Sequence, residues 1–349
     1  MKFNRQIKIN NFEICDKSKT FIIAEAGVNH NGDMDIAKQL INIAKDAKVN
    51  AVKFQTFRAE NLILKNIEKA PYQQKTTDEQ ESQFEMLRRL ELSQKQNFEL
   101  KQYCEKKDII FLTTPFDEVS LDELDELKLP AYKIASTDTT NLPFLKKIAK
   151  KGKPIFLSTG MSYFSEIEMA LNEVYPYNKD VILLQCSANY PLRDDEVNLA
   201  MINTFKKKFD MIIGYSDHSV GIGAAPYAVS MGAKVIEKHF TLDKAMEGPD
   251  HQASLSPEEL KKIVKQIRTV ENYLGSGIKI PTLSENQTRA SLQKSLVASK
   301  KIAKGEIFSE KNITSKRAGG KGISPIYYDK IFGNISPKEF YIDEVIELW

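Results

Sequence analysis

The feature that most constrains the fold of this chain is a strand-then-helix alternation that recurs eight times over about 220 residues. Short runs rich in β-branched and aromatic residues are separated by segments whose apolar residues recur at three- and four-residue spacing, as in amphipathic helices. The eight runs are residues 21–27, 51–57, 109–116, 131–137, 154–160, 181–188, 211–218 and 233–240. Apolar strands joined by single helices predict a parallel sheet that is buried on both faces.

Eight such units favour an α/β fold of the closed (β/α)8 type, a TIM barrel, over an open doubly wound sheet. No Gly-x-Gly-x-x-Gly sequence follows the first run, which also argues against a dinucleotide-binding fold. The connection over about residues 58–108 is much longer than the others. Because long loops at the C-terminal face of a barrel usually shape a substrate site, we expect this one to do so.

The pattern changes after the last long helical segment, which predicts a division of the chain. We expect a barrel domain with an N-terminal hairpin over residues 1–274, a linker over 275–288 and a small second domain over 289–349. The second domain is too small to have much of a core of its own.

Composition excludes several classes of protein. With 50 Lys and Arg against 47 Asp and Glu, the net charge of +3 does not indicate a nucleic-acid partner. No apolar run reaches transmembrane length and the start has no apolar signal region, so we expect neither a membrane partner nor secretion. The cysteines are few, odd in number and without metal-type spacing, which favours a reduced, cytoplasmic protein: Cys15, Cys104 and Cys186.

Nearly every predicted strand ends in polar or charged residues, although barrel strands should be apolar. In this architecture catalytic groups lie at the C-terminal ends of several strands, so we expect an active site there. The residues at these ends are Glu25, Lys53, Gln55, Thr113, Thr114, Lys133, Ser136, Asp138, Ser158, Thr159, Ser187, Asn189, Tyr190, Ser216, Asp217, His218, Glu237, Lys238 and His239.

Histidines end the two last predicted strands, at His218 and His239. A lone histidine at a strand end is more often a hydrogen-bonded structural residue, but two on adjacent strands beside acids can converge on one ion. Spacing alone leaves the ligand role and the structural role about equally open. His30 and His251 follow the first and last strands, and each either caps its loop or faces the cavity.

Lys53 and Lys133 lie in apolar runs, where an ammonium group is costly to bury without an anionic partner. Internal salt bridges are one alternative, with Glu25, Asp138 or Glu237. A bound phosphate or carboxylate is the other, with hydroxyl donors from Thr114, Ser158 and Ser216. One lysine is enough for a Schiff base, but two lysines with several hydroxyls look more like a clamp for a doubly anionic ligand.

A series of motifs carries a resemblance to a known family. In chain order they include IIAEAGVNHNGD, AVKFQTF, KAPYQQKTT, TTPFD, YKIAS, LSTGM, GYSDHS, VIEKHFTLDK, GPDHQASL and LVASKKIAKGEIFSEKNIT. With these, the chain resembles the sialic acid synthase family, the bacterial nonulosonate synthases, nearly end to end. The resemblance implies a TIM barrel followed by a small antifreeze-like (SAF) domain, and a homodimer in which that domain completes the partner's site.

The resemblance also implies a reaction. Phosphoenolpyruvate condenses with the open-chain aldehyde of an N-acylated mannosamine-type sugar and releases phosphate by carbon–oxygen cleavage. N-acetylmannosamine would give N-acetylneuraminate; the alternative is 2,4-diacetamido-2,4,6-trideoxymannose, which would give N,N'-diacetyllegionaminate. The implied cofactor is a divalent metal, Mn²⁺ first, with Mg²⁺ or Co²⁺ as the other candidates.

Carried over residue by residue, the resemblance assigns roles to the polar strand ends. It implies His218 and His239 as metal ligands and Glu25 as an acid/base group. The phosphoenolpyruvate carboxylate would be bound by Lys53, Thr114 and Ser136, and its phosphate by Lys133, Ser158 and Ser216. The sugar would be bound by Gln55, Tyr190 and Asp250, and its N-acyl group by the partner chain's Arg317.

This chain departs from the family pattern at three places. Ser136, Thr137 and Asp138 stand where the family usually has Ser-Gly-Glu, so Asp138 is expected as a shorter catalytic acid. Ala188 replaces an asparagine, which leaves the neighbouring Asn189 as the expected substrate contact. Ala318 replaces the proline that usually follows the Lys-Arg pair. A sugar-sensing barrel without activity, or an ice-binding module, would be the competing kinds of function.

Overall fold

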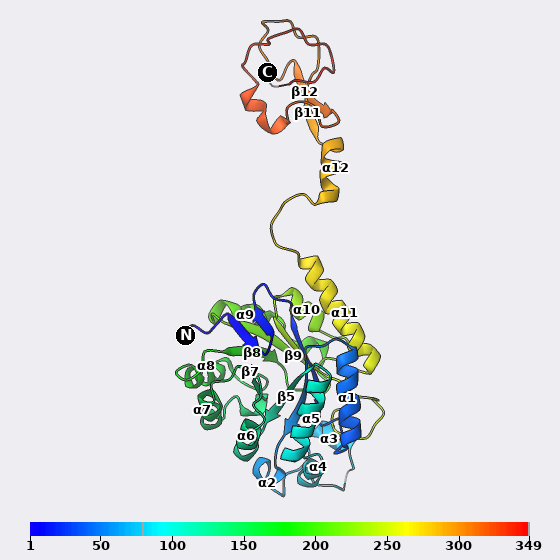
Figure 1. Ribbon diagram of the computed structural model, residues 1–349. Helices are drawn as coiled ribbons and strands as arrows, with labels where there is room; N and C mark the ends of the chain where they lie inside the picture. Colours follow the sequence, from blue (N-terminus) through cyan, green and yellow to red (C-terminus); the bar gives the residue numbers. More distant parts are fainter. Residues whose placement is uncertain (79, 348–349) are drawn as a thin grey trace. The chain divides into compact units, whose positions relative to one another are not determined.

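The structure is a computed structural model that describes residues 1–78 and 80–347. The chain divides into two compact units, one over Met1–Gly275 and one from Ser276 onward. Eight parallel strands of the first unit form a nearly closed barrel, in the order β5-β4-β3-β10-β9-β8-β7-β6, with helices around it (Figure 1).

Each barrel strand lies inside one of the eight predicted runs, which confirms the (β/α)8 fold. The strands are β3 (Phe21–Gly27), β4 (Ala51–Thr56), β5 (Ile110–Pro115), β6 (Tyr132–Ile134), β7 (Ile155–Ser158), β8 (Val181–Cys186), β9 (Ile212–Asp217) and β10 (Val235–His239). Nearly all of their residues are buried, as a sheet covered on both faces requires.

Helices follow the strands and cover the outer face of the barrel. They are α1 (Met34–Asp46), α5 (Gln94–Lys106), α6 (Glu118–Asp125), α7 (Leu142–Lys150), α8 (Phe164–Val174), α9 (Ala200–Lys208), α10 (Ala225–Ser230) and α11 (Pro257–Leu274). Several begin at a side-chain cap; Ser256, for example, accepts a hydrogen bond from the backbone N–H of Glu259 at the start of α11. No helix in the described ranges is long and apolar enough to cross a membrane.

The long connection between β4 and β5 adds three short helices before α5. They are α2 (Ala59–Leu62), α3 (Pro71–Thr76) and α4 (Gln83–Arg89). Buried apolar side chains from this segment, Met86 and Leu90, pack with Val28 and Phe57, which follow β3 and β4. The connection therefore builds a wall at the C-terminal end of the barrel, where the site was expected.

An antiparallel hairpin, β1 (Gln6–Ile9) with β2 (Phe12–Cys15), fills the opposite end of the barrel. Its Ile7, Ile9 and Ile14 are buried in one cluster with residues from the first halves of the strands, such as Phe21 and Phe156. Alternation along the hairpin puts every second side chain into this cluster, which is why it closes the N-terminal end.

The second unit has a small core of its own, formed by residues that include Leu296, Phe308 and Phe340. It contains the antiparallel strands β11 (Lys294–Ala298) and β12 (Ile313–Arg317) and the 3₁₀ helix η3 (Pro325–Lys330). Part of the range expected to be a linker is helical, because α12 (Leu283–Leu292) begins at a capping box formed by Thr282 and Glu285.

A buried ion pair joins β9 to β10 on their outer side. Lys238 lies opposite Asp217 in the strand register, with 2.9 Å between Nζ and Oδ2. Lys238 also donates to the carbonyl of Ser219, and the Asp217 carboxylate accepts from the backbone N–H groups of Ser219 and Ala225. Burial lowers the pKa of Lys238, and Asp217 offsets part of that effect.

We predict that Lys238→Met lowers the free energy of unfolding by about 3 kcal/mol, because it leaves the Asp217 carboxylate buried without its cation. Lys101→Met is the matched control: it removes a lysine from the surface pair with Glu105 on α5 and should cost less than about 1 kcal/mol. Urea unfolding midpoints of the two variants measure the difference. Equal losses would show that the ion pair between β9 and β10 does not stabilise the barrel.

Candidate active site

A cavity of about 560 Å³ lies at the C-terminal ends of the barrel strands. Its floor and sides come from all eight barrel strands and from residues that follow them. All but three of the predicted site residues line it: Glu25, Lys53, Gln55, Thr114, Lys133, Ser136, Ser158, Tyr190, Ser216, His218, His239 and Asp250. The barrel thus brings together side chains that are as many as 225 positions apart, from Glu25 to Asp250.

Four buried charges form one network inside the cavity. The ammonium of Lys53 lies 2.7 Å from Glu25 Oε2 and 3.7 Å from Glu237 Oε2, and the ammonium of Lys133 lies 3.3 Å from Glu237 Oε1. Each of these side chains is at most 5% exposed. Two cations against two anions make the set electrically balanced, which is what permits its burial.

The network shifts the pKa values of its two carboxyl groups in opposite directions. Burial raises the pKa of Glu25 to about 7, against the opposing effect of Lys53. Glu237 is just as buried, but Lys133 and Lys53 together outweigh that burial and lower the pKa of Glu237 to about 2. Glu25 can therefore take up or release a proton near neutral pH, whereas Glu237 stays a carboxylate.

Hydroxyl groups surround the two ammonium groups. Lys53 Nζ donates to Thr114 Oγ1 at 3.0 Å, and Ser216 Oγ donates to Glu237 Oε1 at 3.1 Å. Ser136 Oγ accepts from the backbone N–H of Gly160 at 2.9 Å. Ser158 Oγ is buried without a hydrogen-bond partner among the described residues. Ammonium and hydroxyl donors in one cavity suit an anion with two charged groups.

Two imidazoles lie side by side at the ends of β9 and β10. The ring centroids of His218 and His239 are 5.6 Å apart. His218 Nδ1 donates to the carbonyl of Ser187 at 2.8 Å, and Nε2 of the same ring lies 2.9 Å from the hydroxyl of Tyr190. His239 Nδ1 is buried without a hydrogen-bond partner in the described part of the chain. Burial lowers the pKa of His239 well below its usual value, so the ring is neutral.

These two rings fit a divalent cation. His218 Nε2 faces only the hydroxyl of Tyr190, and His239 Nδ1 has no hydrogen-bond partner among the described residues. Two rings bound to one ion through bonds of about 2.1 Å have centroids about 5 to 6 Å apart, as these do. The backbone acceptor at His218 Nδ1 is the kind of contact that fixes the tautomer of a metal-binding histidine. The described residues place no third His, Cys, Asp or Glu in a cluster with both, so an ion held here keeps open positions for other ligands.

The NeuB family model matches residues 40–279, and the SAF domain model matches residues 293–348. The chain belongs to the NeuB family. This confirms the expected membership of the sialic acid synthase family and identifies the second unit as the site of a SAF domain.

Named relatives agree with this membership. The NeuB-family chain is 51% identical to an N,N'-diacetyllegionaminic acid synthase of Campylobacter jejuni, over 94% of this chain and 99% of that protein. It is 40% identical to the human N-acetylneuraminate-9-phosphate synthase, over 91% of this chain and 88% of the human one. A crystal structure of a sialic acid synthetase of Leptospira borgpetersenii in complex with citrate matches with a TM-score of 0.73 at 36% identity, over 83% of this chain and 98% of that one.

Two residues predicted for this cavity lie elsewhere in this NeuB-family protein, and a third, Arg317, was predicted for the cavity of the partner chain. Asp138 ends a 3₁₀ turn, η1 (Ser136–Asp138), and its carboxylate accepts from Asn141 Nδ2 at 3.0 Å instead of lining the cavity. Asn189 is exposed, bonds to Glu196 and lines a separate cavity beside α8 and α9. Arg317 ends β12, in the second unit.

Three polar residues of the cavity were not in the predicted site, and a fourth, Glu237, was expected only as a salt-bridge partner of the lysines. Glu237 bonds the two lysines, and Thr137 takes the place in the lining that was expected for Asp138. The signal for Glu237 was its position two residues before His239, on the same face of one strand. Gln73 and Gln83 come from the wall formed by α3 and α4, and no periodicity in that connection distinguishes them.

His30 and His251 stabilise loops and do not line the cavity. His30 Nδ1 accepts from the backbone N–H of Gly32. His251 Nδ1 lies 2.6 Å from the hydroxyl of Thr241, and Nε2 lies 3.1 Å from Asn31 Oδ1. Burial lowers the pKa of each ring to about 4.

We predict that the free energy of unfolding falls as the pH drops from about 6.5 to about 4. An unfolded histidine binds a proton near pH 6.5, whereas the two buried rings do so only near pH 4, so acid favours the unfolded chain by about 3 kcal/mol per ring. His251→Asn should be less stable at pH 7.5 and should show a shallower fall over this range. Denaturant titrations at several pH values measure both slopes; parallel slopes for variant and wild type would contradict the assignment.

Proposed function

We propose that this protein condenses phosphoenolpyruvate with the open-chain aldehyde of an N-acylated mannosamine-type sugar, giving a nonulosonic acid and phosphate. The observation that carries the proposal is the balanced, buried set of two lysines and two glutamates beside two adjacent imidazoles in one cavity. Membership of a family whose named relatives are nonulosonic acid synthases supports the reaction class.

The lysines and hydroxyls would bind the two anionic groups of phosphoenolpyruvate. We expect its carboxylate to be bound by Lys53, Thr114 and Ser136, and its phosphate by Lys133, Ser158 and Ser216. Without the ligand, Glu25 and Glu237 neutralise the two ammonium groups. The buried hydroxyl of Ser158, which lacks a partner among the described residues, is an available donor for a phosphate oxygen.

His218 Nε2 and His239 Nδ1 would hold a divalent cation, for which Mn²⁺ is our first choice and Mg²⁺ or Co²⁺ the others. Bound there, such an ion acts as a Lewis acid on the aldehyde oxygen of the sugar. The hydroxyl of Tyr190, now 2.9 Å from His218 Nε2, would turn to the sugar. Gln55 and Asp250, which also line the cavity, would bind sugar hydroxyls.

Proton transfers would fall to Glu25. Carbon 3 of phosphoenolpyruvate attacks the aldehyde carbon, and the aldehyde oxygen takes up a proton while positive charge grows at carbon 2. Water adds at carbon 2 and loses a proton. The tetrahedral intermediate then expels phosphate, which takes the remaining hydroxyl proton as the carbon–oxygen bond breaks and the 2-keto acid forms. With a pKa of about 7, Glu25 can give the first proton and take the second.

Between the two sugars, the apolar wall of the cavity favours the diacetamido one. The side of the cavity formed by α2 and α4 is lined by apolar residues: Leu62, Ile63, Met86, Leu87 and Leu90. Methyl groups at C6 and on a second acetamido group would bury apolar surface there, whereas hydroxyls would lose hydration. The relative that is 51% identical is a diacetyllegionaminic acid synthase, which supports the same choice.

The second unit is proposed to act in trans. In a homodimer, Arg317 of the SAF domain would bind the N-acyl group of the sugar in the partner's cavity. Arg317 is an exposed residue at the end of β12, and so is available for such a contact.

We predict that phosphate release from phosphoenolpyruvate requires both an acylated aminosugar and a divalent cation. Chelation should abolish release and Mn²⁺ should restore it, while His218→Ala and His239→Ala should each lower it by at least about 100-fold. Calorimetry with Mn²⁺ alone should show that each variant has lost metal binding, with the melting temperature as the folding control. A wild-type Mn²⁺ response in either variant would remove it from the ligand set.

We predict that kcat/KM for 2,4-diacetamido-2,4,6-trideoxymannose exceeds that for N-acetylmannosamine by at least about tenfold, the value of one or two buried methyl groups. Phosphate release and mass analysis of the 2-keto acid measure both sugars in one assay. A preference for N-acetylmannosamine would assign the chain to N-acetylneuraminate synthesis instead.

A further inference from the structure

Two carboxamide side chains interrupt the apolar wall of the cavity. Gln73, on α3, is 8% exposed, and Gln83 is the first residue of α4. Gln83 Nε2 donates to Gln73 Oε1 at 3.0 Å, and the same oxygen accepts from the backbone N–H of Ala70 at 3.0 Å. Both glutamines line the cavity.

The Gln83 amide keeps hydrogen-bonding capacity toward the cavity. One of the two Nε2 hydrogens is used for Gln73, and Oε1 accepts no hydrogen bond from the described residues. Its neighbours in the lining are Met86 and Leu87, which supply no polar partner. A ligand that fills this part of the cavity and cannot bond the amide would leave a desolvated polar group, at a substantial cost.

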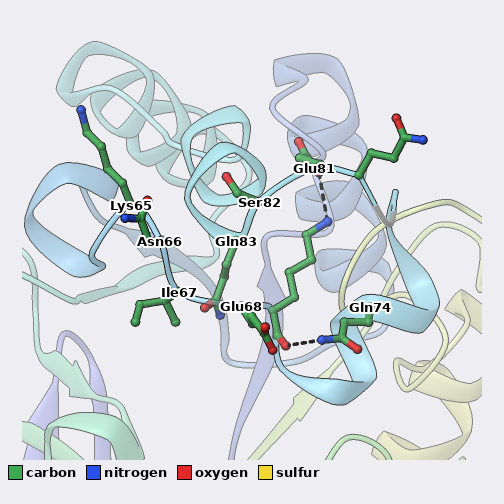
Figure 2. A pocket seen from close by; sticks show the side chains of 10 residues that line it. Lys65, Asn66, Ile67, Glu68, Gln74, Glu81, Ser82 and Gln83 are labelled. Atoms are coloured by element: carbon green, nitrogen blue, oxygen red, sulfur yellow. Dashed lines mark hydrogen bonds and ion pairs between the residues drawn. The ribbon is translucent and has the colours of Figure 1, made fainter.

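A buried lysine, Lys69, fixes the segment that carries the two glutamines. Lys69 Nζ donates to Thr77 Oγ1 at 2.9 Å and to the carbonyl of Asp78 at 2.6 Å, and lies 3.5 Å from Glu81. The carbonyl of Lys69 also accepts from Gln74 Nε2 at 3.0 Å. Lys69 lines a second cavity together with Gln74, Glu81 and Gln83, which Figure 2 labels. Gln83 lines both cavities, so it stands in the partition between them.

The same segment is also tied to the loop that carries Asp250. The backbone N–H of Gly248 donates to the carbonyl of Thr76 at 3.2 Å. Fixed on both sides, α3 and the start of α4 present their amides in a set position before a ligand arrives. Preorganised hydrogen-bonding groups of this kind discriminate between ligands more strongly than an apolar surface does.

We propose that Gln73 and Gln83 form a specificity-determining amide pair that binds an acylamino group of the sugar. The inference rests on the proposed function. A secondary amide has one N–H and one C=O, and the Gln83 side chain offers the matching acceptor and donor, while Gln73 holds it in orientation. The methyl of the acyl group would then lie against Met86 and Leu87.

The test is Gln83→Leu, a change of similar volume that removes both hydrogen-bonding groups. We expect the KM for the sugar to rise on the order of 10- to 100-fold, with the KM for phosphoenolpyruvate and Mn²⁺ binding unchanged. Gln83→Asn keeps the amide but withdraws it by one methylene, so its KM should lie between those of wild type and Gln83→Leu. Gln80→Leu is the matched control, because Gln80 is exposed on the same segment and does not line the catalytic cavity.

Assays with both sugars show which acylamino group is bound. A rise for both assigns the pair to the group that the sugars share, and a rise for the diacetamido sugar alone assigns it to the second group; each supports the inference. An unchanged sugar KM in Gln83→Leu, with a melting temperature equal to that of Gln80→Leu, would overturn it while leaving the proposed function intact. No phosphate release by the wild type with either sugar would instead reject the proposed function, and this inference with it.

Discussion

The interaction on which the rest of the site depends is the burial of four charges at the centre of a barrel. Glu25 and Lys53 are direct neighbours in the strand register, and Glu237 connects Lys53 to Lys133. Any one of these charges alone would be too costly to bury, so the four residues are stable only as a set. The set also separates the roles of its members, because it lets Glu25 titrate near neutral pH and keeps Glu237 ionised.

The strands that carry the imidazoles use both of their faces. On β10, Glu237 and His239 point into the barrel, while Lys238 between them points outward to Asp217. On β9, Ser216 lines the cavity and Asp217 takes the outer position. Because side chains alternate along a strand, cavity residues alternate with residues of the outer ion pair on both strands. Each member of that ion pair directly precedes one of the two histidines. The distance between the two imidazoles therefore depends on the buried ion pair between Lys238 and Asp217, outside the cavity.

The cavity has two halves with different origins. Strand ends supply lysines, acids, hydroxyls and imidazoles, and these suit the condensation chemistry that we propose. The long connection between β4 and β5 supplies an apolar wall with two amides in it, and this half suits the choice of sugar.

The eight strands and most of the cavity residues could be predicted from the sequence, because strand periodicity is local and the polar strand ends of a parallel barrel must meet at one face. The tertiary structure decided the direction of the side chains beyond the strands. In the 3₁₀ turn after β6, Asp138 accepts a hydrogen bond from Asn141, and Thr137 lines the cavity instead. Asn189 lines a different cavity. Glu237 became part of the network because two lysines from other strands meet there. Gln73 and Gln83 joined the site because Lys69 and the loop after β10 fix their segment, and contacts between such distant residues leave no periodicity in the sequence.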